Sequence, residues 1–169
     1  MDEKDKKDLK TVLCIYLPYN LKGKVTATGV DTHHVDMEGF YSEVDFDVDV
    51  ELDSINVDTE ELFVRAITDN EDLYEYIYET QSDGILWTIE EFIPYLRSWD
   101  SITEKEAEEY ESFIYPLFEE GNSQGIPAVV KVDNMDKFIE WICIHKLDYF
   151  GLIKRKLALE AKENIYEFL

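Results

Sequence analysis

Residues 43–53 alternate without a break between acidic and apolar side chains, and this pattern constrains the fold more than any other feature of the chain. A helix would scatter both sets of side chains around its axis, whereas a strand separates them onto two faces. We therefore predict a strand whose inner face carries Val44, Phe46, Val48, Val50 and Leu52. Its outer face would carry the acids, which we call the acidic ladder: Glu43, Asp45, Asp47, Asp49, Glu51 and Asp53.

The rest of the chain predicts a mixture of strands and helices. Further strands are expected at 24–30, 63–67 and 128–132, and residues 9–17 suit either a helix or a strand. Capping signatures predict helices that begin at 68, 88 and 103, and another is expected from 134 to Gly151. We expect one α+β domain over 1–169, with an antiparallel sheet from the N-terminal half packed against helices from the C-terminal half. Residues 1–8 would form a frayed charged end, and Asp31–His34 a connection.

The charge of the chain is lopsided and limits its partners. The 169 residues include 39 acids and 16 bases, and the net charge is −23. Residues 25–130 hold 28 of the acids and three of the bases, Arg65, Arg97 and Lys105. Such a surface excludes direct binding to nucleic acid and to anionic membranes, which both require a basic face. A cationic partner is compatible with it.

The sequence predicts a cytoplasmic protein. The charged start is followed by an apolar run of only six residues, 12–17, and no run reaches the roughly 20 apolar residues of a membrane span. Cys14 and Cys143 lie far apart and lack metal-binding spacing, so we expect two reduced, buried thiols.

No motif in the sequence indicates catalysis, and we expect no catalytic, cofactor-binding or metal-binding residues. Phosphate-binding glycine loops and the serine-hydrolase elbow are absent. His33 and His34 lie among acids and suit either a metal site or an exposed loop, but adjacent strand residues point to opposite faces. An EF-hand counted from Asp45 would need Gly and Glu where Val50 and Ile55 stand.

The acidic ladder and a cluster of three tyrosines each have two interpretations. The acidic ladder either protects a solvated sheet edge from aggregation or binds a cationic protein, and its spacing of about 6.6 Å is similar in scale to that of phosphates. Tyr74, Tyr76 and Tyr78 lie on a predicted helix, where Tyr74 and Tyr78 share a face. They suit either an interface or partial burial in the core with surface hydroxyls.

Both ends of the chain resemble a known group of proteins. Residues 16–22 (YLPYNLK) and 145–153 (HKLDYFGLI), followed by 157–159 (LAL), are similar to signatures of small uncharacterised proteins from Bacteroides-type phages and mobile elements. Asn20 stands where that family has Gly, as does the Arg155-Lys156 pair. The resemblance implies an origin without a mechanism. We expect His145 and Asp148 to orient each other and to cap a helix.

These observations predict a non-enzymatic interaction protein of a phage or mobile element. The acidic ladder would mimic nucleic acid and inhibit a basic host or competitor protein, such as a nuclease, in the manner of anti-restriction or anti-CRISPR proteins. The alternative is a structural or accessory phage protein whose acidity serves solubility only.

Overall fold

A computed structural model describes residues 1–35, 41–115, 129–130, 135–162 and 165–166, leaving aside the side chains of 30–35, 41–43, 114–115 and 129–130. Its helices are α1 (Glu3–Tyr16), α2 (Glu71–Ser82), α3 (Glu104–Glu111) and α4 (Met135–Ile144), with 3-10 turns η1 (Leu17–Tyr19) and η2 (Trp99–Ser101). Its strands are β1 (Lys22–Val35), β2 (Tyr41–Asn56), β3 (Glu61–Ala66), β4 (Trp87–Thr88), β5 (Ile93–Leu96), β6 (Ile114–Tyr115), β7 (Val129–Val130) and β8 (Leu159–Glu160). Within these residues, the helices are all too short or too polar to cross a membrane.

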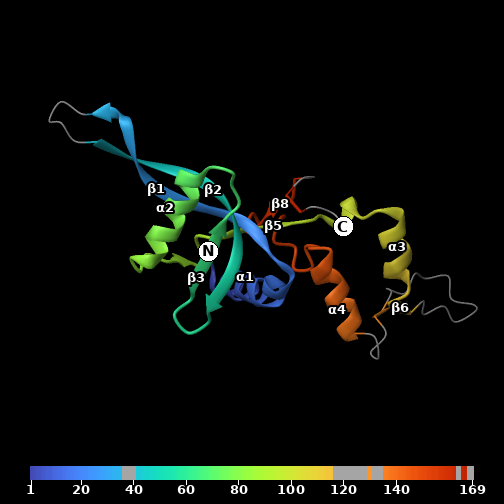
Figure 1. Cartoon of the computed structure of the whole chain (residues 1–169). Coiled ribbons are helices and arrows are strands. Elements are labelled where there is room, and N and C mark those ends of the chain that lie inside the picture. The colour runs from blue at the N-terminus through green and yellow to red at the C-terminus, as the bar shows by residue number, and fades with distance from the viewer. Residues whose placement is uncertain (36–40, 116–128, 131–134, 163–164, 167–169) are drawn as a thin grey trace, which may run out of the picture.

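Six strands form one curled sheet in the order β4-β3-β2-β1-β5-β8 (Figure 1). β8 runs parallel to β5, and the other neighbours are antiparallel. β6 and β7 pair in a second, two-stranded sheet. Helices α3 and α4 follow in the C-terminal half, so the predicted α+β fold, with an antiparallel sheet from the N-terminal half, is confirmed.

The predicted strand at 43–53 is the centre of β2. Val48, Val50 and Leu52 are at most 2% exposed, and Phe46 is half-buried against the same core. Val44 is 43% exposed, because β1 and β2 extend together as a hairpin beyond the rest of the molecule (Figure 1). The expected connection at Asp31–His34 belongs instead to this hairpin, in which β1 continues to Val35.

Helix α1 covers the inner face of the sheet. Its buried residues are Leu9, Val12, Leu13 and Tyr16, which follow the helical i, i+3, i+4, i+7 spacing. The ambiguous segment 9–17 is therefore helical as far as Tyr16. The Tyr16 hydroxyl donates a hydrogen bond to the carbonyl of Leu147, which ties α1 to the C-terminal part of the chain.

The charged N-terminus is folded, contrary to the expected frayed end. Asp2 caps α1 by accepting a hydrogen bond from the amide of Asp5, and the helix begins at Glu3. Arg155 then pairs with Asp5 and with Asp8, at 2.8 Å from Asp8 Oδ2. These ion pairs link the first helix to a turn near the C-terminus, a long-range contact that the local sequence does not reveal.

The predicted helix at 88 is wrong. Thr88 and Glu91 have the spacing of a capping box, and the amide and hydroxyl of Thr88 do donate to Glu91 Oε2, at 2.7 and 2.9 Å. These bonds close a turn between β4 and β5 instead of opening a helix. Pro94 follows within β5, where its missing N–H would have broken a helix.

The other helix predictions hold in part. Helix α2 begins after Asn70, whose side chain accepts bonds from the amides of Asp72 and Leu73, so its cap lies two residues after Thr68. Helix α3 has the predicted capping box at Thr103 but ends at Glu111. The expected continuation of that helix at 116–121, and the caps at 133–134, lie outside the described residues. Helix α4 ends at Ile144, and Lys146 has a φ of 55°, so the chain leaves the helix before Gly151.

Gly23 in β1 is required for a close approach of β5. A Cβ atom at this position would lie 2.5 Å from Phe92 Cζ and 2.7 Å from the backbone oxygen of Ile93. We expect Gly23→Ala to lower the free energy of unfolding by about 1–2 kcal/mol, because the backbone of β5 must shift. Urea unfolding followed by tryptophan fluorescence measures this change.

Gly29→Ala provides the matched control on the same strand. The three atoms nearest to its Cβ atom would all belong to the ring of Phe46, the closest at 2.8 Å, so a half-buried side chain rather than a strand backbone has to move. The destabilisation by Gly23→Ala should therefore be the larger, and a Gly23→Ala protein as stable as the wild type would contradict this explanation of β1–β5 packing.

Candidate functional site

The acidic ladder lies on the outer face of β2, as predicted. Asp45, Asp47 and Asp53 are exposed, whereas Asp49 and Glu51 are half-buried. Glu43 lies opposite Val30 in the hairpin, and its side chain lies outside the described residues. The exposed part of the ladder thus belongs to the projecting hairpin and to the opposite end of the strand.

Neighbouring strands supply partners to much of the ladder. Lys24 Nζ lies 2.9 Å from Asp47 Oδ2, and this hydrogen bond lowers the pKa of Asp47. The Thr28 hydroxyl donates to Asp45 at 2.7 Å. Arg65 on β3 pairs with Glu51. The antiparallel register thus places basic and hydroxyl groups of β1 and β3 beside Asp45, Asp47 and Glu51, so these carboxylates already have partners within the chain.

Asp49 is held by a buried tyrosine. The Tyr95 hydroxyl, on β5, donates to Asp49 Oδ1 at 2.5 Å, and burial together with this carboxylate raises the pKa of Tyr95. Tyr166 donates in turn to the carbonyl of Tyr95 at 2.9 Å. The C-terminal segment therefore covers the ladder near Asp49. It leaves open the half of the ladder that lies in the projecting hairpin, which we call the distal half.

The distal half of β2 is also an open sheet edge. β3 pairs with β2 from Val50 to Asn56, and no other strand in the described ranges pairs with the outer edge of Tyr41–Val48. Acidic side chains on such an edge discourage pairing with other chains. Edge protection and partner binding thus both remain compatible with the ladder.

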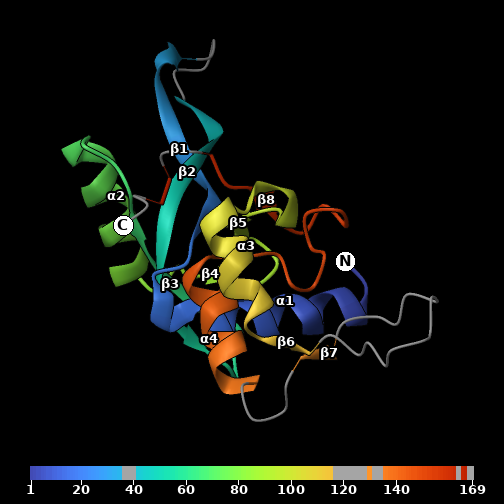
Figure 2. The same ribbon diagram turned by 90° about the vertical axis from the view of Figure 1, so that its right-hand side faces the viewer.

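A groove lies beside the ladder, between α2 and β3. One hollow of about 370 Å³ is lined by Asp53 and Phe63 among others, and a second of about 520 Å³ is lined by acids of α2 and the preceding turn. Tyr74 and Tyr78 line both hollows. Helix α2 lies apart from α3 and α4 in both views (Figure 1 and Figure 2), so these helices leave the groove uncovered.

The three tyrosines of α2 have different environments. Tyr76 packs against Phe46 and its hydroxyl donates to the carbonyl of Thr28, so this residue is partly buried as expected. Tyr74 and Tyr78 are 47% and 65% exposed. They share a helix face, as predicted. Of the two interpretations of these tyrosines, partial burial in the core suits Tyr76 better than Tyr74 and Tyr78, because Ile77 already anchors α2 to the core.

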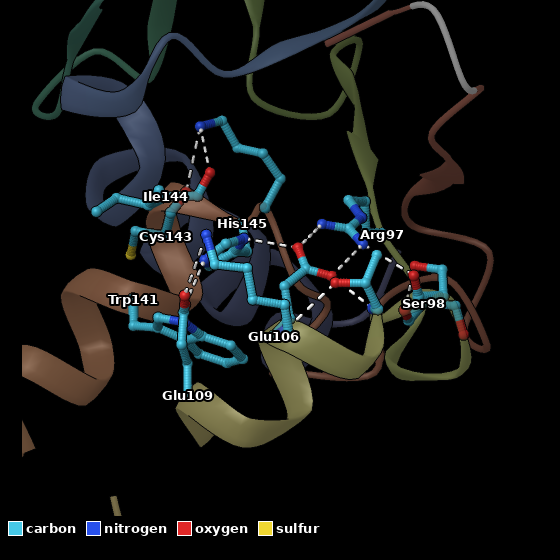
Figure 3. A network of polar contacts seen from close by, with 12 residues as sticks. Arg97, Ser98, Glu106, Glu109, Trp141, Cys143, Ile144 and His145 are labelled. Atoms are coloured by element: carbon cyan, nitrogen blue, oxygen red, sulfur yellow. Dashed lines mark hydrogen bonds and ion pairs between the residues drawn. The ribbon is translucent and has the colours of Figure 1, made fainter. Parts of the chain in front are cut away.

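A second cluster of polar and charged side chains joins α3, α4 and the segment that follows β5 (Figure 3). Arg97 and Glu106 form a bidentate pair at 2.6 and 3.0 Å, and both side chains are about nine-tenths buried. His145 Nδ1 lies 2.8 Å from Glu106 Oε1. The Trp141 indole donates to Glu109 at 2.9 Å. These bonds between three elements assign the cluster a structural role.

The expected pairing of His145 with Asp148 is wrong. His145 faces Glu106, whereas Asp148 accepts hydrogen bonds from the amides of Leu152 and Ile153 at 2.7 and 2.9 Å. Asp148 therefore caps the turn that follows α4 and does not orient the histidine. The change in chain direction at Lys146 separates the two side chains.

Other candidate sites give little support for chemistry. Within the described part of the chain, no group of three or more His, Cys, Asp and Glu residues is placed to hold a metal ion. The side chains of His33 and His34 lie outside it. Both cysteines are free; Cys143 is buried as expected, whereas Cys14 is exposed.

Comparison of the chain with protein-family models, with curated proteins and with solved structures finds no match.

Proposed function

We propose that the chain is a non-enzymatic, cytoplasmic protein of a phage or mobile element that binds a basic protein through the acidic ladder. The observation that carries this proposal is the exposure of Asp45 and Asp47 on an open strand edge of a projecting hairpin. A two-stranded arm with one anionic face fits a cleft that normally receives a nucleic-acid backbone. The specific form we propose is mimicry of nucleic acid, which blocks a nuclease or another basic protein.

Charge and geometry support this form. Alternate side chains on a strand are about 6.6 Å apart, a spacing similar in scale to that of backbone phosphates. The net charge of −23 adds a long-range field that attracts basic proteins and speeds their association. The side chain of Asp47 is 57% exposed although it pairs with Lys24. A cation of the partner protein can therefore reach the Asp47 carboxylate.

The alternative is an accessory protein whose acidity serves solubility. The pairs Lys24–Asp47 and Arg65–Glu51 favour it, because they satisfy ladder carboxylates within the chain. The open edge of β2 favours it as well, since charged residues keep such an edge from aggregating. The two functions differ in whether a basic protein binds specifically at the ladder.

The test compares capture of basic proteins by the wild type and by an Asp45→Asn, Asp47→Asn variant. We expect nucleic-acid-binding proteins to be captured from host lysate at low salt, and to be released by high salt or by added duplex DNA. The variant should bind the captured protein about tenfold or more weakly, because charge pairs at protein interfaces contribute more than about 1 kcal/mol each. Calorimetry with the purified captured protein measures this ratio.

An Asp58→Asn, Asp83→Asn variant is the matched control. Both residues are exposed and lie outside the ladder. Replacing them changes the net charge by the same amount as the replacement of Asp45 and Asp47. Weakening only in the ladder variant supports mimicry. Equal weakening in both variants, or in neither, assigns the acidity to solubility or to non-specific attraction and overturns the proposal.

A further inference from the structure

The groove between α2 and β3 exposes two tyrosines that the fold does not need. Tyr74 and Tyr78 lie one helical turn apart, are 47% and 65% exposed, and line both hollows of the groove. Helix α2 is anchored without them. Ile77 is buried, and the Gln81 amide exchanges two hydrogen bonds of 2.8 Å with the backbone of Val64. These bonds fix the helix against the edge of β3, so the walls of the groove are set before any ligand arrives.

Acidic residues outnumber basic residues in the lining of the groove. Asp53 lines one hollow, and the acids lining the other are Asp69, Glu71 and Glu75. Arg65 is the basic residue of the first hollow, and its charge is compensated by Glu51. The groove therefore combines aromatic faces with an excess of negative charge.

The floor of the first hollow is apolar. Phe63 is 40% exposed on the outer face of β3, and Val64 and Ala66 also line the hollow. An apolar floor accepts an aliphatic stem, tyrosine faces attract a cation, and carboxylates accept its hydrogen bonds. The planar guanidinium group satisfies all three conditions at once, because it stacks on a ring while its N–H groups remain free to donate.

We propose that this groove binds an arginine side chain in a basic segment of the partner protein. The identity of the partner as a basic protein rests on the proposed function, but the site does not, since its tyrosines are separate from Asp45 and Asp47. Asp53 belongs both to the ladder and to the groove, but the covered carboxylates Asp49 and Glu51 separate it from Asp45 and Asp47. A partner segment that bridges this stretch would contact the exposed end of the ladder with its charges and insert an arginine beside α2.

The test titrates the full chain with three peptides that differ at one position. The probes are acetyl-Gly-Leu-X-Leu-Gly-amide with arginine, lysine or citrulline at X, where citrulline keeps the shape of arginine without its charge. We expect the arginine peptide to shift the NMR ring resonances of Tyr74 and Tyr78, and to bind several-fold more tightly than the lysine peptide. The citrulline peptide should bind at least tenfold more weakly than the arginine peptide.

Variants locate the binding. A Tyr74→Ala, Tyr78→Ala protein should bind the arginine peptide about tenfold more weakly, and Tyr74→Phe, Tyr78→Phe should retain the affinity, since the ring faces remain. Both pairs lie on an exposed helix face, and alanine favours a helix, so circular dichroism should show an unchanged fold. Equal binding of the citrulline peptide, or unchanged affinity of the alanine variant, overturns the inference.

The two proposals fail in different ways. The Asp45→Asn, Asp47→Asn protein keeps the groove and should bind the arginine peptide as the wild type does. If it captures basic proteins normally while the peptide still binds at Tyr74 and Tyr78, the proposed function is wrong and the groove stands. If the ladder variant loses capture but no peptide shifts these rings, the groove is wrong and the ladder stands.

Discussion

Replacing Glu106 with glutamine is expected to lower the free energy of unfolding by about 3–5 kcal/mol, because it removes a buried negative charge that faces the guanidinium group of Arg97. The side chains of Glu106 and Arg97 are 11% and 8% exposed, and they face each other through two hydrogen bonds. Glu106 also accepts a bond from the amide of Thr103 at 2.6 Å. Glutamine keeps the shape of the side chain but offers one acceptor and no charge to these donors.

Glu108→Gln is the matched control, since Glu108 lies on the same helix and is exposed. Its unfolding free energy in urea, followed by near-ultraviolet circular dichroism, should stay within about 0.5 kcal/mol of the wild type. A Glu106→Gln protein with the same midpoint as Glu108→Gln would show that the Arg97 pair contributes nothing to stability, and the structural role of this cluster would be wrong.

The pair of Arg97 and Glu106 makes the free energy of unfolding depend on pH. Hydrogen bonds from Arg97 and Thr103 lower the pKa of Glu106 to about 2. The unfolded chain, with a glutamate pKa near 4.3, therefore binds the proton first as the pH falls. The stabilisation by Glu106 should be complete above about pH 4.5 and should disappear towards pH 2, so the difference between wild type and Glu106→Gln should shrink over that range.

The sequence was sufficient to predict β2 because one strong local pattern determined it. Strict alternation from Glu43 to Asp53 admits only an extended conformation, and burial of Val48, Val50 and Leu52 follows from it. The register with β1 was not predictable, since it depends on pairing over distance. That register, rather than the strand itself, determines that Lys24 and Thr28 contact the ladder.

Two similar capping signatures had different outcomes. Thr103 is followed by Glu-Lys-Glu-Ala-Glu-Glu, which favours a helix, and α3 forms there with its capping box. Thr88 is followed by Ile-Glu-Glu-Phe-Ile-Pro, in which Phe92 is drawn into the core and Pro94 prevents a helix. The capping residues alone therefore do not decide between a helix and a turn.

The buried cluster at Arg97 was missed, although one signal was available. Residues 25–130 hold three bases among 28 acids, so each of those bases has many possible partners. Arg65 and Arg97 are indeed paired, with Glu51 and Glu106. The small number of basic residues in this stretch indicates that its arginines form ion pairs within the fold. Only the structure shows which acid each arginine contacts.

The groove was only partly predictable. Helical spacing places Tyr74 and Tyr78 on one face, and this prediction is confirmed. Whether that face is buried depends on how the helix meets the sheet. Gln81 docks α2 on the edge of β3, and this side-chain contact turns the two tyrosines outward. Such an orientation has no signature in the local sequence.

Lys146 is expected to destabilise the fold near neutral pH, so that Lys146→Met stabilises it. The side chain is buried, and its Nζ donates to the carbonyls of Cys143 and Ile144 at 3.2 and 3.3 Å. Burial lowers the pKa of Lys146 to about 8. Because an unfolded lysine has a pKa near 10.4, the unfolded state binds more protons between these values, and this difference opposes folding by about 3 kcal/mol at pH 7.

We therefore expect Lys146→Met to exceed the wild type in unfolding free energy by up to about 3 kcal/mol at pH 7, and the excess to disappear as the pH rises from 8 to about 10. Comparing two variants at each pH is necessary, since burial also raises the pKa of Cys143 to about 11, which lowers stability over part of the same range. Lys156→Met is the matched control, because Lys156 has a φ of 61°, close to the 55° of Lys146, but is exposed. A Lys146→Met protein that is less stable than the wild type at pH 7 would show that the rings of Tyr19 and Tyr166, 5.8 and 5.4 Å from the ammonium group, outweigh its desolvation.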